Sequence, residues 1–447
     1  MEYNPQQIQA LECINNFLKP GNTDKLFILK GNAGTGKTTL LNVIAGKLCD
    51  NFEHVMITAP THRAAKVLSK KTGKPAKTLH SLLYDAEPLE SGYGVRLKRK
   101  TTFSKEPVLY IVDEASMIGD RITSSREFFC ETPLLTDLLQ YVSDVNPNNK
   151  ILFVGDPCQL PPIGYNFGEQ SPALFPRYFE QKFGISGKSF ELTEIVRQHK
   201  DSYILKGAQL LRRSISEDKT DTTFYKINLP NPSAALKQYM RCYRSANNTA
   251  VKLIASTNKN VNWWNNTIRE QLGYAPAKPE VGDKVVIDRG WTNDSYILTN
   301  GDAGTIFEVN DSVETFGGLR FMKVKLLLDD IANDPVTIET LLNLDHLYSE
   351  KGWLTEEQEK ALIHEAMKYN PAYRSSRDIR NDPYLNAVRL RYAYALTCHK
   401  AQGSEFDNVI LHPYYGQDKV VNLRYLYTAI TRAKQNLYSY EMKMFNR

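Results

Sequence analysis

The sequence predicts an α/β protein with parallel sheets and a smaller β-rich insertion in its second half. Apolar, β-branched runs recur along the chain, separated by stretches with the apolar spacing of helices. Such continuous runs are typical of parallel strands buried on both faces. Residues 281–330 differ, because they read as short strands joined by glycine turns, as in a small β-barrel.

The apolar runs end at residues whose side chains can carry chemistry. The runs are Lys25–Lys30, Val55–Thr58, Val108–Val112 and Ile151–Val154 in the first half, and Val251–Ala255, Tyr392–Leu396 and Asn408–Leu411 in the second. Because open α/β sheets bind ligands at the carboxyl ends of their strands, we expect the groups that follow these runs to gather at one edge.

Composition sets limits on the class of protein. A chain of 447 residues is long enough for two or three domains, and 42% hydrophobic with 24% charged residues is ordinary for a globular protein. No apolar run approaches the ~20 residues needed to cross a bilayer, and no leader segment is recognisable, so we expect no membrane association and a cytoplasmic location. Six scattered cysteines without a CxxC pair favour reduced thiols and argue against a zinc site.

The most specific motif is Gly31–Thr39, Gly-Asn-Ala-Gly-Thr-Gly-Lys-Thr-Thr, which lies between the run Leu26–Leu29 and a helical stretch. It has every fixed position of a P-loop: the glycines turn backbone N–H groups toward phosphates, Lys37 reaches the β and γ oxygens, and the Thr38 hydroxyl can bind Mg²⁺. The positive end of the following helix favours the same anion. The motif predicts binding of a nucleoside triphosphate.

Two further strand ends suit hydrolysis of that triphosphate. Asp113 and Glu114 follow the strand Leu109–Val112, where one carboxylate can bind the metal and the other can activate water. Gln159, in a proline-rich turn after the next strand, can contact the γ-phosphate or orient the water.

Positive charge is concentrated in two places. From His54 to Tyr84 the chain has no Asp or Glu but six lysines and arginines, and a second cluster follows at Arg96–Lys100. One-sign stretches of this kind are either solvated faces or nucleic-acid contacts.

Together these segments resemble the superfamily 1B DNA helicases of the petite-integration-frequency (PIF), RecD and Dda branch, and the resemblance spans nearly the whole chain. The matching segments are Gly31–Thr39 (motif I), Thr58–Ala65 (Ia), Lys77–Leu82, Asp113–Ser116 (II), Gly155–Pro162 (III), Leu192–Gln198 (IV), His399–Ser404 (V) and Tyr427–Ala433 (VI). The resemblance implies two RecA-like P-loop NTPase domains, with ATP and Mg²⁺ as cofactors.

The resemblance also implies an ATP site shared by both domains. The catalytic residues it implies are Lys37, Glu114, Gln159, Arg197 and Arg432. The nucleotide-binding residues are Gln7, Asn32, Ala33, Gly34, Thr35, Gly36, Lys37, Thr38, Thr39 and Gly403, and the metal ligands are Thr38 and Asp113. Arg197 and Arg432 are implied to reach the γ-phosphate from the second domain. Arginine suits this role because its planar guanidinium stabilises charge spread over phosphoryl oxygens.

Other motif positions are implied to contact single-stranded DNA. They are Pro60, Thr61, His62, Arg63, Thr78, His80, Asn258, His399, Lys400 and Ser404. Trp263, Trp264 and Tyr84 are candidates for stacking on bases, although core packing is the ordinary role of such aromatics.

The implied organisation has four parts. RecA-like domain 1A comprises residues 1–83 and 107–190, and RecA-like domain 2A comprises 191–280 and 395–447. A small wedge insertion, 1B, covers 84–106, with Phe103 as a guess for its apolar tip, and an SH3-like β-barrel insertion, 2B, covers 281–394. The stretch Asn370–Tyr384 has no assigned role.

The sequence therefore predicts an ATP- and Mg²⁺-dependent DNA helicase that acts on single strands and single/double-strand junctions and is a monomer in solution. The family implies 5′-to-3′ movement, unwinding of duplex or folded DNA, a compact bacterial or phage type, and roles in DNA replication, recombination or repair. Two alternatives stay open: an RNA-directed superfamily 1 translocase, and an ATP-gated nucleic-acid-binding clamp that does not unwind.

Overall fold

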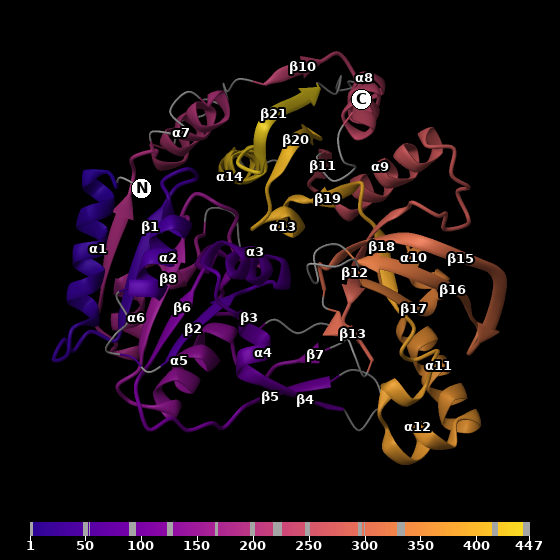
Figure 1. Cartoon of the computed structure of the whole chain (residues 1–447), viewed down its shortest axis with the longest axis horizontal. Coiled ribbons are helices and arrows are strands. Elements are labelled where there is room, and N and C mark those ends of the chain that lie inside the picture. Colours follow the sequence, from indigo (N-terminus) through magenta and orange to yellow (C-terminus); the bar gives the residue numbers. More distant parts are fainter. Residues whose placement is uncertain are drawn as a thin grey trace.

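The computed structural model has two α/β domains and an antiparallel insertion (Figure 1). It describes residues 3–440 except 48–51, 53, 89–94, 123–127, 166–168, 197–201, 218–225, 246–250, 294–296, 299, 329–335 and 414–418. Within these residues, no helix has both the length and the apolar character needed to cross a membrane.

The first domain is a six-stranded parallel sheet with helices on both faces. Its strand order is β3 (Ala76–Thr78), β2 (His54–Ala59), β6 (Val108–Val112), β8 (Lys150–Gly155), β1 (Leu26–Gly31) and β9 (Gly187–Leu192). One face packs against α1 (Pro5–Leu18), α2 (Lys37–Lys47) and α3 (His62–Thr72). The other packs against α4 (Leu79–Leu83), α5 (Leu134–Val145) and α6 (Pro176–Phe183).

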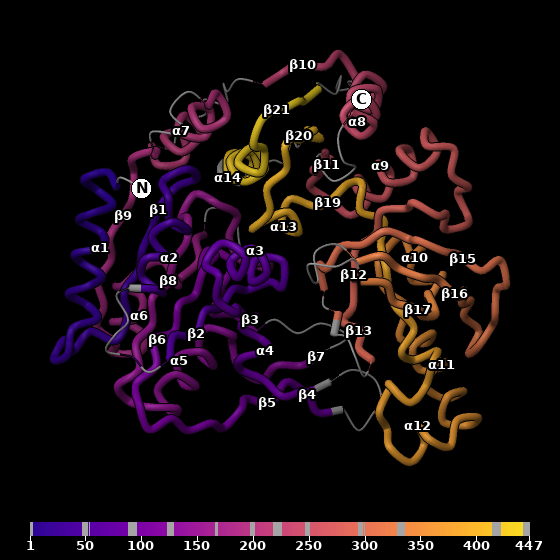
Figure 2. Tube along the Cα trace, viewed as in Figure 1, coloured from indigo at the N-terminus to yellow at the C-terminus, as the bar shows by residue number. Residues whose placement is uncertain are grey.

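The second domain is a five-stranded parallel sheet assembled from two distant parts of the chain. Its strand order is β10 (Ile227–Leu229), β21 (Ala433–Tyr440), β20 (Phe406–Leu411), β11 (Val251–Ala255) and β19 (Ala395–Thr397). Its helices are α7 (Tyr203–Ser216), α8 (Pro232–Ser245), α9 (Asn258–Gln271), α13 (Cys398–Ala401) and α14 (Lys419–Ile430). Figure 2 shows the yellow C-terminal strands returning beside the rose-coloured β11.

The insertion is a five-stranded antiparallel sheet whose two edges meet. Its strand order is β17 (Val336–Asn343), β16 (Leu319–Leu328), β15 (Ala303–Phe316), β12 (Lys284–Arg289) and β18 (Arg389–Tyr392). A bridge between Leu342 and Val388 joins the end of β17 to the start of β18, which closes the sheet on itself. The apolar run Tyr392–Leu396, expected as one strand, is thereby divided between β18 in the insertion and β19 in the second domain.

Helices extend the insertion on one side. They are α10 (Leu344–Leu347), α11 (Glu356–Tyr369) and α12 (Pro371–Ser376), and a short hairpin, β13 (Trp291–Thr292) with β14 (Ile297–Leu298), lies apart. The unassigned stretch Asn370–Tyr384 forms α12 and a following turn, and Tyr373 packs with Leu319 and Phe321 in the core between α11 and the sheet. The stretch Asn370–Tyr384 therefore extends the hydrophobic core of the insertion.

A three-stranded sheet projects from the first domain, with two strands from the segment before β6 and one from the segment after it. It comprises β4 (Tyr84–Pro88), β5 (Val95–Arg99) and β7 (Phe128–Phe129). Phe103 is 90% exposed, but it comes after β5 and so lies near the base of the β4–β5 hairpin, where Tyr84 pairs with Arg99. The next residue, Ser104, donates from its backbone N–H to Val145 O (3.1 Å) at the end of α5. The guess that Phe103 forms the apolar tip of this hairpin was wrong.

A buried ion pair attaches the insertion to the second domain. Arg269 of α9 donates from Nε and one terminal nitrogen to both oxygens of Asp283 (2.8 and 3.0 Å), and both side chains are almost fully buried. The hydroxyl of Tyr394 and the backbone N–H of Glu280 also donate to this carboxylate. Because a buried carboxylate is stable only with such partners, these bonds hold Asp283, at the start of the insertion, against α9 of the second domain.

Asp283→Asn should therefore destabilise the protein by about 3–5 kcal/mol, since it leaves the charge of Arg269 buried without its counterion. Urea denaturation followed by tryptophan fluorescence measures the change. Glu356→Gln is the matched control, because its partner Lys360 lies on an exposed helix surface. Equal denaturation midpoints for the two variants would contradict this role of Asp283.

Acid should also destabilise the second domain through His412. Nδ1 of this buried ring accepts from Trp264 Nε1 (3.1 Å), and burial lowers the pKa of His412 from 6.5 to about 4. The folded protein then binds fewer protons than the unfolded chain between these values. The free energy of unfolding should fall by about 1.4 kcal/mol per pH unit below 6.5 through this residue. Denaturation of His412→Asn between pH 5 and 7 should show a shallower slope than the unchanged protein, and an identical slope would refute the assignment.

Candidate nucleotide cleft and nucleic-acid interface

The P-loop connects β1 to α2 at the carboxyl edge of the first sheet. Gly34 and Gly36 have φ of 78° and 84°, the left-handed region that favours glycine. A Cβ on Gly36 would lie 2.5 Å from Nε2 of Gln7, so this glycine also allows α1 to pack against the loop. Gln7 donates from Nε2 to Thr35 O (3.1 Å). Its Oε1 accepts from the backbone N–H of Asn4, the N-cap of α1, so the two residues form a capping box. Gln7 thus supports the loop as well as lining the cleft.

Lys37 begins α2, and its ammonium group folds back over the loop. Nζ donates to the carbonyl oxygens of Gly31 (2.7 Å) and Asn32 (3.0 Å). Thr38 and Thr39 follow on the same wall of the cleft. The loop therefore presents a cation and two hydroxyl-bearing residues to one space.

The acidic pair lies across this space at the end of β6. Burial, and then the charge of Glu114, raise the pKa of Asp113 to about 7. Glu114 has φ of 52° and ψ of 39°, a strained conformation for a residue with a side chain. Such strain is found where the surrounding structure holds a side chain for function. The oxygens of Thr38 and Asp113 are hard ligands of the kind Mg²⁺ prefers, so these residues fit the metal that the P-loop implies.

Both domains line the cleft, which has a volume of ≈ 1330 Å³. Gln159 reaches it from the first domain, and Gly403 and Arg432 reach it from the second. The guanidinium of Arg432 donates to Thr428 O (3.0 Å) and Ser404 O (3.3 Å) within its own domain. Arg197, the other arginine expected here, lies outside the described residues. The residues expected to bind nucleotide from Asn32 to Thr39 form the loop and the first turn of α2, and all except the buried Thr35 line the cleft.

The structure adds cleft residues that the motifs did not indicate. Ser202, Leu205, Lys206 and Gln209 line the cleft from one face of α7, and Lys71 lines it from α3. Their spacing of three and four residues is a helical stripe. Such a stripe was visible in the sequence, but nothing there showed which way it faces.

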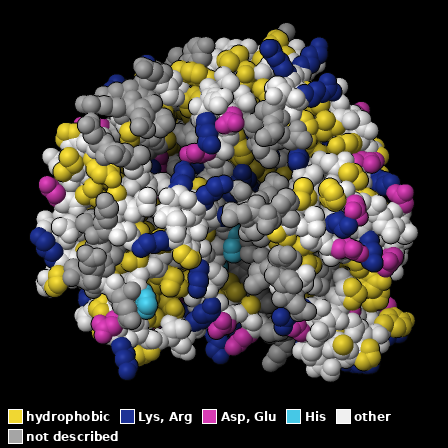
Figure 3. Space-filling view, in the orientation of Figure 1, with side chains coloured by type: hydrophobic (Ala, Val, Ile, Leu, Met, Phe, Trp, Pro, Cys, Tyr) yellow, Lys and Arg dark blue, Asp and Glu magenta, His cyan; other side chains and the backbone are white. Residues whose placement is uncertain are grey.

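Four helices that carry the expected DNA contacts begin in the same way. Each has a threonine N-cap whose hydroxyl accepts from a backbone N–H: Thr61 for α3, Thr78 for α4, Thr257 for α9 and Thr397 for α13 (3.1–3.2 Å). The first two come from the first domain and the others from the second. Figure 3 shows lysine and arginine side chains along the central hollow of the molecule, with a histidine inside it. Capped helix N-termini and cations are suited to phosphates.

Around these caps the structure brings several predicted residues together. Burial lowers the pKa of His62, while Asp302 of the insertion opposes that shift. Burial, and then the neighbouring His62, lower the pKa of His80. Burial lowers the pKa of His399 as well. Pro60 and Thr61 directly precede His62 in the sequence, and Asn258 follows the Thr257 cap and is exposed at the start of α9.

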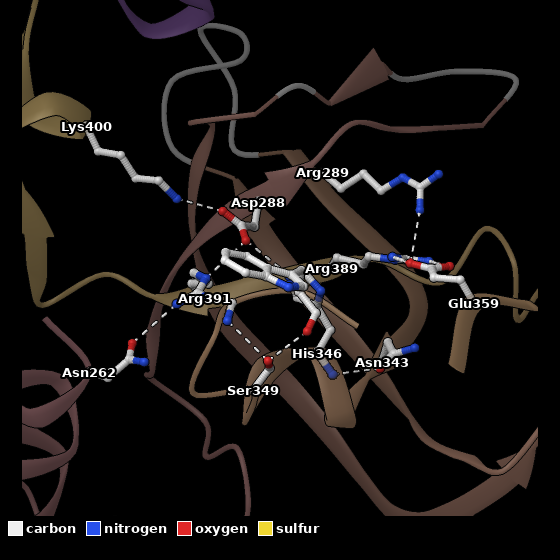
Figure 4. A network of polar contacts seen from close by, with 12 residues as sticks. Asn262, Asp288, Arg289, Asn343, His346, Ser349, Glu359, Arg389, Arg391 and Lys400 are labelled. Carbon is white, nitrogen blue, oxygen red and sulfur yellow. Dashed lines mark hydrogen bonds and ion pairs between the residues drawn. The ribbon is translucent and has the colours of Figure 1, made fainter. Parts of the chain in front are cut away.

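Lys400 is held in an ion-pair network with the insertion (Figure 4). Its Nζ donates to Oδ1 of Asp288 (2.6 Å), whose Oδ2 accepts from Arg391 (3.0 Å) and lies 3.1 Å from Nε2 of His346. Burial alone would raise the pKa of Asp288, but the hydrogen bond from His346 and the charges of Lys400 and Arg391 hold it below its ordinary value. Lys400 therefore ties α13 to β12.

Two expected DNA contacts and two of the three stacking candidates have other surroundings in this conformation. The guanidinium of Arg63 lies 5.1 Å from the ring of Phe406 in the second domain. Ser404 is buried, and among the described residues its hydroxyl has no hydrogen-bond partner. Of the stacking candidates, Trp264 and Tyr84 are buried in cores and only Trp263 is exposed, at 50%.

The second basic cluster is compensated locally. Ion pairs join Arg96 to Glu131, Lys98 to Glu87, Arg99 to Asp144 and Lys100 to Asp85. Each of these four cations therefore has an acidic partner on a neighbouring segment. The acid-free stretch 54–84, by contrast, supplies α3 and α4 and their capped N-termini.

Comparison with known proteins agrees with this geometry. The family model of the AAA domain matches residues 2–226, and that of the UvrD-like helicase C-terminal domain matches residues 392–439. The chain is 23% identical to the ATP-dependent RecD2 DNA helicase of Deinococcus radiodurans, over 93% of this chain and 47% of that protein. It is 26% identical to the ATP-dependent DNA helicase Dda of enterobacteria phage T4, over 92% of this chain and 93% of that protein.

The chain spans less than half the length of the first two curated relatives that it matches, and nearly all of Dda. Among solved structures, the Pif1 helicase from Bacteroides in complex with ADP-AlF₃ and single-stranded DNA matches with a TM-score of 0.52 and 19% identity, covering 100% of this chain and 94% of that one. This likeness shows the fold, with two RecA-like domains. The chain belongs to the AAA domain family, and over nearly its whole length it is similar to the DNA helicases RecD2 and Dda.

Proposed function

We propose that this protein is an ATP- and Mg²⁺-dependent DNA helicase that moves 5′-to-3′ on single-stranded DNA and unwinds duplex or folded DNA. The observation that carries the proposal is the cleft itself: the first domain supplies the P-loop, the acidic pair and Gln159, and the second supplies Arg432. A cleft made by two domains can convert binding and hydrolysis into relative domain motion.

Six residues that line the cleft have parts in the proposed hydrolysis. Lys37 exchanges its two carbonyl partners for the β- and γ-phosphate oxygens, and Glu114 accepts a proton from the attacking water. Gln159 orients that water, and Arg432 turns from Thr428 O and Ser404 O toward the γ-phosphate as the cleft closes. Thr38 and Asp113 would hold Mg²⁺, which would neutralise charge on the phosphoryl oxygens.

Translocation follows from the distribution of the capped helices. Thr61 and Thr78 belong to one domain, whereas Thr257 and Thr397 belong to the other. If the capped helix ends of each domain bind phosphates, opening and closing of the cleft would move one pair of ends along the strand while the other pair holds it. Single/double-strand junctions are the proposed substrate, and a monomer suffices because one chain supplies both walls of the cleft.

The names of the relatives support DNA as the nucleic acid, since RecD2 and Dda are named DNA helicases and the Pif1 structures contain single-stranded DNA. The 5′-to-3′ direction rests on the resemblance to this branch.

Glu114→Gln should lower kcat for ATP by a factor of about 10²–10⁴, because it removes the general base but keeps the side-chain shape. Binding of ATP and single-stranded DNA should persist. Lys37→Ala should lose hydrolysis and weaken nucleotide binding. Lys360→Ala, an exposed lysine on α11, is the control. Turnover of Glu114→Gln near the rate of the unchanged protein would show that another group is the base.

Strand separation tests the proposed function directly. Duplexes with a 5′ or a 3′ single-stranded tail are mixed with the protein, ATP and Mg²⁺, and release of the labelled strand is measured. We expect unwinding of the 5′-tailed duplex alone. Preference for the 3′-tailed duplex would indicate 3′-to-5′ movement and contradict the proposed direction. Hydrolysis stimulated by RNA but not by DNA would indicate an RNA translocase, and nucleotide-dependent binding without turnover would indicate a clamp.

A further inference from the structure

The hydroxyl of Tyr427 connects the two domains behind the cleft. Tyr427 belongs to α14 of the second domain, and its side chain is 1% exposed. The hydroxyl donates to Oδ2 of Asp156 (2.6 Å) and accepts from the backbone N–H of Ala33 (3.1 Å). Asp156 begins the turn that carries Gln159, and Ala33 is a P-loop residue. One oxygen atom therefore contacts both the P-loop, which follows β1, and the turn that follows β8.

The direction of these two hydrogen bonds is determined by chemistry. Burial, and then the charge of Asp156, raise the pKa of Tyr427 well above its ordinary value, so the phenol stays neutral and has one proton to donate. That proton faces the buried carboxylate of Asp156, whose Oδ1 accepts from Cys158 N–H (3.0 Å). The lone pair left on the hydroxyl is the acceptor for Ala33. Phenylalanine would fill the same volume and leave both groups without this partner.

Neighbouring contacts hold α14 against the same turn. Thr428 Oγ1 accepts from Leu160 N–H (2.9 Å), and a terminal nitrogen of Arg424 donates to Pro157 O (2.5 Å) and Gln159 O (3.1 Å). These bonds fix the backbone of the turn, but Tyr427 alone among them also reaches the P-loop. Arg432 follows five residues later, just beyond the end of α14.

We propose that Tyr427 is a positioning residue for ATP hydrolysis: its hydroxyl holds the P-loop and the turn of Gln159 in register with α14, so that Arg432 enters the cleft in the correct place. Tyr427 does not touch the reacting phosphate. This inference rests on the proposed function, because it assigns the residue a part in that reaction.

Tyr427→Phe tests the inference, with Tyr425→Phe as the matched control. The hydroxyl of Tyr425 is also buried in α14, but it donates to His412 O inside the second domain. Steady-state ATP hydrolysis with saturating single-stranded DNA is measured for the unchanged protein and both variants. We expect kcat to fall about tenfold in Tyr427→Phe, with KM for ATP changed less than about threefold, and both to stay near normal in Tyr425→Phe.

Hydrogen exchange supplies a measurement that does not depend on activity. Without nucleotide, peptides covering residues 26–36 and 151–160 should exchange faster in Tyr427→Phe than in the unchanged protein or in Tyr425→Phe, since Ala33 N–H loses its acceptor. Unchanged exchange in these peptides, or an unchanged kcat, would overturn the inference. Equal losses of kcat in both variants, accompanied by equal falls in melting temperature, would also overturn it, since they indicate only a weakened helix. If the unchanged protein fails to hydrolyse ATP with DNA, the proposed function fails, and the exchange data still decide whether Tyr427 holds the P-loop.

Discussion

Contact between α14 and the turn at residues 156–160 determines how the two α/β domains meet, and the ATP site depends on that meeting. The turn comes from the end of β8, so its position is set by the first sheet, while α14 packs on the second. Across a buried boundary, Tyr427 and Arg424 donate hydrogen bonds to the turn, and Thr428 accepts one from it. Gln159 lies in this turn and Arg432 follows α14, so this contact helps to bring both residues to the same cleft.

The insertion is attached to the second domain by charges rather than by apolar packing alone. Arg269 and Asp283 form one buried pair at its entry, and Asp288 gathers Lys400, Arg391 and His346 at a second point. Gly352 is part of this arrangement, because a Cβ there would overlap the guanidinium of Arg391. Since Lys400 belongs to α13, whose N-terminus carries the Thr397 cap, the insertion and the proposed DNA-binding helix are held as one unit.

Charge along the sequence proved informative only after its partners were known. The cluster Arg96–Lys100 and the stretch 54–84 look alike as strings of cations, yet acids on adjacent segments neutralise the first. In the second stretch, Lys71 pairs with Glu405 of the other domain and Arg63 lies over Phe406. Some of these cations therefore join the domains, a use that spacing in the sequence cannot distinguish from nucleic-acid binding.

Local chemistry was sufficient for the parts of the protein that follow from short segments. The P-loop, the acidic pair after β6 and the parallel strands could be predicted because each depends on residues adjacent in the chain: glycines that adopt positive φ, carboxylates at a strand end, and runs apolar on both faces. The division of Tyr392–Leu396 between two sheets, the displaced position of Phe103, the cleft-facing stripe of α7 and the two hydrogen bonds of Tyr427 required the tertiary structure. Each depends on partners tens to hundreds of residues away, and only packing of the sheets and insertion against one another brings those partners into contact.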